Sequence, residues 1–161
     1  MDLKLYLERA ENELILAKAI FTLTGDEKLQ REAFEIKSPL TFYSAVISHA
    51  YYCIFYSAKA YLLKKGMKVE APEEHRKTYE EFKKLVLEGV IDVELLKFYE
   101  QAMIRAERLL GIIRVEKKKR GDFTYQIIPQ ANQEPAKESL DNAREFFRHI
   151  YSDETKYLSF P

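Results

Sequence analysis

The chain has 161 residues, of which 47% are hydrophobic and 32% are charged, and this composition is typical of one folded domain rather than of a disordered segment. Basic and acidic residues both total 26, so the zero net charge argues against a protein that coats nucleic acid or an anionic membrane. The single cysteine, Cys53, excludes a disulfide within the chain and fits a reducing, cytoplasmic location.

Targeting and membrane segments are not expected. The first residues, MDLKLYLERAENELILAKAIF, carry charges throughout and lack the uninterrupted apolar core of a signal peptide. The most apolar stretch, residues 47–66, is interrupted by His49 and Lys59, so we expect no membrane span.

Hydrophobic residues recur at helical spacing along most of the chain, which predicts an all-α fold of five helices. Glycines mark the expected ends of the first three helices, and Ser38 followed by Pro39 is typical of a helix start. Residues 26–37 fit either a short helical turn or a connector. The five helices are expected at about residues 2–24, 39–65, 72–87, 92–113 and 135–151.

We treat residues 1–152 as one helical domain and residues 153–161 as a tail. Within the domain, the third predicted helix has a single inward stripe at helical spacing, formed by His75, Tyr79, Phe82 and Val86.

The second predicted helix is apolar around its whole circumference. One face carries Phe42, Val46, His49, Cys53, Tyr56 and Ala60, and the opposite side carries Ile47, Tyr51, Ile54, Ala58 and Leu62. A helix of this kind is buried on all sides. Since one small bundle rarely encloses a helix fully, we expect its second face to meet a second copy of the chain.

Residues 48–66, SHAYYCIFYSAKAYLLKKG, resemble the HEPN domain family of small prokaryotic helical proteins. Members often carry a Ser-Arg-x-Tyr-Tyr-x-x-Phe run, followed by Ala-Lys-Ala and paired leucines before a glycine. His49 stands where arginine is usual in that run. His75 and Phe82 are similar to a downstream His and mid-helix Phe of the family.

The resemblance covers roughly Asp2 to Tyr151. Near the end of the long fourth helix, members place an Arg shortly before an Asp-Tyr pair. Asp122 with its following Phe resembles that pair, and Arg114 or Arg120 resembles the Arg.

This resemblance implies an up-and-down bundle, usually as a homodimer, and the apolar circumference of the long second helix predicts that this helix is the central one. The resemblance also implies frequent pairing with a minimal nucleotidyltransferase. In some branches of the family it implies metal-independent RNase activity.

The RNase branches use an Arg, then four to six residues, then a His, and the matching string here is Arg144 to His149. Five residues along a continuous helix rotate a side chain by about 140°, so these two side chains are expected to diverge. We therefore interpret the string as chance, although residues from two subunits could still meet around one phosphate.

His49 is a polar residue on an apolar helix face. His49 and Cys53, four residues apart, could ligate a metal with His75 as a third ligand, but no other residue pattern indicates a metal or a cofactor. The simpler interpretation is a core or interface histidine. We expect it to be largely buried, neutral at pH 7, and hydrogen-bonded to a hydroxyl or a backbone carbonyl.

The best nucleic-acid candidate is a basic run that precedes two aromatic residues. Positive charge at this point also complements the dipole at the end of the fourth helix. Any RNA or nucleotide binding is expected to be weak and salt-dependent. The run consists of Lys117, Lys118, Lys119 and Arg120.

Three functions remain open at this point. The absence of a compact Arg–His motif favours a non-catalytic, dimeric HEPN-like module that binds a partner such as a nucleotidyltransferase, in a toxin–antitoxin-type or RNA-related system. The alternative is an RNase toxin with Arg and His at the dimer seam. The aromatic content is also compatible with small-molecule or nucleotide binding between helices.

Overall fold

The computed structural model describes residues 2–110 and 133–155, and these residues form helices and connecting turns without a β-strand. The helices are α1 (Leu3–Thr24), α2 (Glu27–Phe34), α3 (Tyr43–Lys64), α4 (Glu74–Leu87), α5 (Val93–Leu110) and α7 (Gln133–Thr155). The prediction of an all-α fold is therefore confirmed. Within residues 26–37, the short-helix alternative is the correct one, since α2 occupies most of that segment.

Two helices, α3 and α4, begin later than predicted, and both predicted starts were at prolines. Ser38 and Pro39 do not start α3, which begins at Tyr43 after Phe42, because the backbone at Leu40 is hydrogen-bonded to a side chain of α2. Likewise, α4 begins at Glu74 rather than at Pro72. In contrast, α5 begins close to the predicted start at residue 92, where Asp92 caps it: its Oδ1 accepts from the Glu94 amide at 2.9 Å.

Helix α7 begins two residues before Pro135 and extends to Thr155. Its helical backbone thus passes residue 152, the predicted end of the domain. The division into a domain of residues 1–152 and a tail stays a prediction, and residues 156–161 lie outside the described residues.

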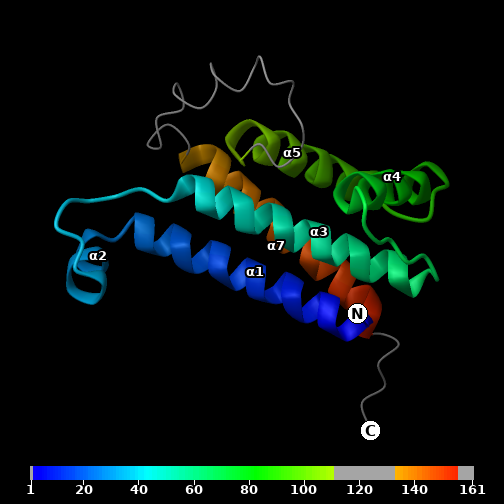
Figure 1. Cartoon of the computed structure of the whole chain (residues 1–161), viewed down its shortest axis with the longest axis horizontal. Helices are drawn as coiled ribbons and strands as arrows, with labels where there is room; N and C mark the ends of the chain where they lie inside the picture. The colour runs from blue at the N-terminus through cyan, green and yellow to red at the C-terminus, as the bar shows by residue number, and fades with distance from the viewer. Residues whose placement is uncertain (1, 111–132, 156–161) are drawn as a thin grey trace, which may run out of the picture.

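Helix α3 is the central element of an up-and-down bundle (Figure 1). It contacts α1, α4, α5 and α7. Helices α1 and α5 run opposite to α3 and α7, and the start of α1 lies at the same end of the bundle as the end of α7 (Figure 1). The prediction of a long central second helix is confirmed, since α3 corresponds to it.

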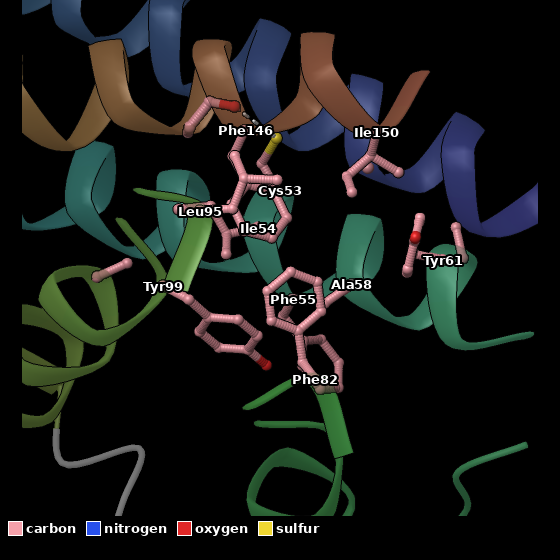
Figure 2. Close-up of a cluster of buried hydrophobic side chains, with 14 of the residues drawn as sticks. Cys53, Ile54, Phe55, Ala58, Tyr61, Phe82, Leu95, Tyr99, Phe146 and Ile150 are labelled. Carbon is pink, nitrogen blue, oxygen red and sulfur yellow. Dashed lines mark hydrogen bonds between the residues drawn. The ribbon is translucent and has the colours of Figure 1, made fainter. Parts of the chain in front are cut away.

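Much of both faces of α3 is buried by the chain itself. Cys53 and Ala60 on one face are fully buried, and so are Ile54 and Leu62 on the other. Figure 2 shows Cys53, Ile54 and Phe55 surrounded by aromatic and aliphatic side chains of α4, α5 and α7. His49, Tyr52 and Tyr56 of α3 stay partly exposed, and the expectation that a second copy contacts this helix stays a prediction.

The α1–α2–α3 connection is held by the buried amide of Gln30, which is 1% exposed. Its Nε2 donates to the carbonyls of Leu23 at 2.8 Å and Leu40 at 3.0 Å. Its Oε1 accepts from the Leu40 amide at 2.9 Å. One side chain thereby satisfies backbone groups from both ends of the connection, which fixes where the chain enters α3.

We predict that Gln30→Ala lowers the free energy of unfolding by about 1–3 kcal/mol, because it leaves buried backbone groups without partners. Urea denaturation measures the loss. Lys28→Ala, at an exposed position of the same helix, is the control and should change the midpoint little. Equal losses in the two variants would contradict the role given to the Gln30 amide.

Candidate functional site

His75, at the start of α4, packs against the aromatic residues of α3. Its ring stacks on Phe55 with centroids 4.1 Å apart, and its Nδ1 lies 2.8 Å from the hydroxyl oxygen of Tyr51. Burial, followed by the charge of Tyr52, raises the pKa of Tyr51, so the Tyr51 hydroxyl keeps its proton; the tautomer of His75 decides which of the two groups donates. His75 is therefore fixed in one orientation by a ring stack and a hydrogen bond.

Lys59 lies beside this group and was missed as a functional or structural residue by sequence reasoning. Its side chain is only 4% exposed, and its ammonium group pairs with the carboxylate of Glu74. The ammonium nitrogen also lies 4.8 Å from the centroid of the Tyr6 ring and 5.7 Å from that of Phe55. The sequence does contain a signal for this role, because Lys59 is a charged residue in the middle of an apolar helix and a buried charge needs a partner.

The residues of the Tyr-Tyr-x-x-Phe and Ala-Lys-Ala motifs thus lie together with His75 at the α3–α4 junction. Tyr51 and Phe55 contact His75. Lys59 pairs with Glu74, which directly precedes His75 in the sequence. This arrangement attaches the first turn of α4 to α3. We interpret these motif residues as a structural clamp rather than as a reaction centre.

A second polar group lies between α1 and α3, and we call it the α1–α3 seam: Arg9, Glu13, His49, Tyr52 and Tyr56. Glu13 Oε2 lies 2.6 Å from His49 Nδ1. The guanidinium of Arg9 lies 4.4 Å from the centroid of the Tyr56 ring, and the Tyr52 and Tyr56 rings stack at 6.1 Å.

The predicted environment of His49 was wrong in two respects. Its side chain is 30% exposed rather than largely buried, and its partner is a carboxylate rather than a hydroxyl or a carbonyl. The reason is the packing of α1 alongside α3, which places Glu13 opposite His49. Periodicity within α3 correctly grouped His49 with Tyr56 but could not show which residue of another helix faces it.

The structure does not bring the three proposed metal ligands together. His49 is bonded to Glu13, and His75 to Tyr51. The Cys53 thiol is buried and points to the carbonyl of Ala143 at 3.9 Å. Within residues 2–110 and 133–155, no group of three or more His, Cys, Asp or Glu side chains is placed to hold a metal ion. None of the helices in that part of the chain is long and apolar enough to cross a membrane.

Arg144 and His149 both lie on the uninterrupted helix α7 and both are exposed. Arg144 lies 3.5 Å from Asp141 on the same helix. Because their side chains leave a continuous helix in different directions, one chain does not assemble them around a common point.

The basic run of Lys117, Lys118, Lys119 and Arg120 lies outside the described residues, as do Arg114 and Asp122. Nucleic-acid binding by this run stays a prediction.

The fold and the motif residues define a helical bundle with the α3–α4 clamp described above. The family model of the HEPN domain matches residues 24–153, which is most of the chain. The chain therefore belongs to the HEPN domain family. No curated protein and no solved structure matches it significantly. The match begins at the last residue of α1, so Arg9 and Glu13 of the seam precede it.

His75 gives a prediction on pH dependence. Burial, followed by the charge of Lys59, lowers the pKa of His75 below its ordinary value of 6.5. The unfolded chain then binds more protons at this residue than the folded chain, so the free energy of unfolding should fall as the pH drops below about 6.5. We predict that His75→Asn, which keeps an acceptor near the Nδ1 position but does not titrate, removes part of this fall.

The measurement is the urea midpoint of each protein between pH 8 and pH 5. His149→Asn is the matched control, since His149 is exposed on α7, and it should retain the wild-type pH dependence. If His75→Asn and wild type lose the same stability over this range, the assigned environment of His75 is incorrect.

Proposed function

We propose that this protein is a homodimeric, non-catalytic HEPN module that acts by binding a partner protein, with a minimal nucleotidyltransferase as the expected partner in a toxin–antitoxin-type system. The observation that carries the proposal is the divergence of Arg144 and His149 on one continuous helix. Since the two side chains of one chain point in different directions, the His149 base and the Arg144 cation of that chain cannot act together on one phosphate.

Dimerisation is supported by family membership and by exposed apolar side chains outside α3. Ile15 is 58% exposed and the adjacent Leu16 is also exposed, both on the outer side of α1. Leu87, at the end of α4, is 74% exposed. Apolar surface of this kind favours association when it is contiguous, and α1 offers two neighbouring residues. We therefore place the dimer surface on α1.

The second candidate is a metal-independent RNase that uses Arg144 from one copy and His149 from another. The observation in its favour is that both side chains are exposed on α7, so a second copy could reach them. In that case the His would accept the 2′-hydroxyl proton while the Arg stabilises charge on the phosphate.

We predict that light scattering gives a mass of twice 19.0 kDa at micromolar concentration. Ile15→Glu should shift the mass toward that of the monomer, because it places a charge in the proposed interface. Leu87→Glu is the matched control and should leave the dimer intact. A wild-type monomer would contradict dimerisation, and dissociation by Leu87→Glu alone would move the interface to the end of α4.

We further predict that the purified protein does not cleave RNA in the presence of a chelator, and that Arg144→Ala and His149→Ala change nothing. A nucleotidyltransferase encoded beside this chain should co-purify with wild type and with both variants. Cleavage that disappears in either variant would favour the RNase, and loss of co-purification without cleavage would place the partner site on α7.

A further inference from the structure

The turn between α4 and α5 exposes a group of large apolar side chains that the fold does not bury. Leu87, Val90 and Val93 are 74%, 45% and 57% exposed. Within residues 2–110 and 133–155, no other stretch of this length exposes three large apolar side chains. Isolated apolar residues on a surface are ordinary, whereas a cluster of them is typical of a binding surface. We call residues 87–94 the α4–α5 tip.

The backbone of the tip is held in one conformation by hydrogen bonds. The Gly89 amide donates to the Val86 carbonyl at 3.0 Å, and the Val90 amide donates to the Leu85 carbonyl at 2.9 Å. This is the Schellman arrangement, and it places Gly89 at a φ of 76°, which glycine adopts without steric cost. Ile91 is buried in the core and anchors the turn. The exposed side chains are thus presented on a rigid support, which lowers the entropy cost of binding.

The tip is acidic, and one of its charges is not explained by the fold. Residues 85–96 contain no basic residue and three acidic ones, Glu88, Asp92 and Glu94. Asp92 caps α5, and Glu94 lies in the first turn of that helix, where the helix dipole favours a negative charge. Glu88 lies at the C-terminal end of α4, where the dipole disfavours it. In the described part of the chain Glu88 forms no ion pair, since Lys84, one turn before it, pairs with Glu81 at 2.7 Å.

This charge decides between the possible occupants of the tip. It repels nucleic acid and anionic lipid, because both carry phosphate groups. Two tips in a symmetric contact would bring acidic residues against acidic residues. The complementary surface is that of a different protein, with an apolar depression surrounded by lysine or arginine.

We propose that the α4–α5 tip is the surface through which this chain docks on its partner protein. The three exposed apolar side chains enter an apolar depression of the partner, and basic residues at the edge of that depression pair with Glu88. This inference rests on the proposed function, since it requires that the chain acts by binding a partner. It separates the partner site from the dimer surface on α1 and from the exposed face of α7.

The first measurement tests the surface without the partner. Its probe is a synthetic amphipathic helix of leucine and lysine, titrated at constant ionic strength and followed by the methyl NMR signals of the protein. We expect saturable shifts for Leu87, Val90 and Val93 and unchanged signals for Ile15 on α1. The same peptide with glutamate in place of lysine is the control and should not bind. Equal shifts at Ile15, or equal binding of the glutamate peptide, would contradict the proposal.

The second measurement is calorimetry with the nucleotidyltransferase encoded beside this chain. Leu87→Gln and Glu88→Lys should each weaken its binding about tenfold, since one removes an apolar contact and the other opposes like charges. The matched controls are Ile104→Gln, farther along α5, and Glu32→Lys, on α2, both at exposed positions, and they should bind as wild type does. All four variants should keep the wild-type mass in light scattering. A lower mass for the two tip variants would make a second copy the occupant and overturn the proposal.

The two measurements separate failure of this inference from failure of the proposed function. If wild type and both tip variants bind the nucleotidyltransferase equally well, the proposed function stands and the docking surface is wrong. If the lysine peptide binds at the tip but the nucleotidyltransferase does not bind at all, the docking surface stands and the proposed partner is wrong. Absence of binding in both measurements would overturn both.

Discussion

The burial of most of α3 is the constraint on which the rest of the structure depends. Its side chains are apolar on every side, so the other helices are arranged to remove each side from water. Helix α1 covers one flank, α7 the next, and α4 with α5 the remainder. Each large side chain buried in this way contributes about 1.5–3 kcal/mol, and α3 contains many of them, including Tyr51, Ile54 and Leu62. The order of the helices around α3 follows from this requirement.

Polar residues within such a helix need a partner. Lys59 has Glu74 of α4 and His49 has Glu13 of α1, whereas Ser57 donates to the carbonyl of Cys53 in its own helix at 2.7 Å. The two pairs between helices fix the rotation of α4 and α1 about their own axes as well as their positions, because a salt bridge or hydrogen bond is directional and apolar contact is not. The polar pairs thus define how α1 and α4 are oriented on the apolar surface of α3.

The sequence predicted the fold better than the site, and the reason is the range of the interactions involved. Periodicity is local, so it placed the inward stripe of α4, including Phe82, and grouped His49 with Tyr56. Where a helix starts depends on which backbone groups are hydrogen-bonded to other parts of the chain. The Leu40 amide is bonded to Gln30, ten residues away, so α3 starts at Tyr43 and not at the predicted Pro39. The partner of His49 lies 36 residues away on another helix, where no local pattern could identify it.

The α3–α4 clamp and the α1–α3 seam differ in how they relate to the part of the chain that matches the family. Tyr51, Phe55, Lys59 and His75 lie inside the matched region, point mainly into the chain, and have their hydrogen-bonding or charged groups satisfied by one another or by Glu74. The seam combines residues of α3 with Arg9 and Glu13, which precede the match, and it leaves groups unsatisfied on a partly exposed surface. The polar contacts of the α3–α4 junction therefore lie wholly within the matched region, whereas those between α1 and α3 join matched residues of α3 to residues that precede the match.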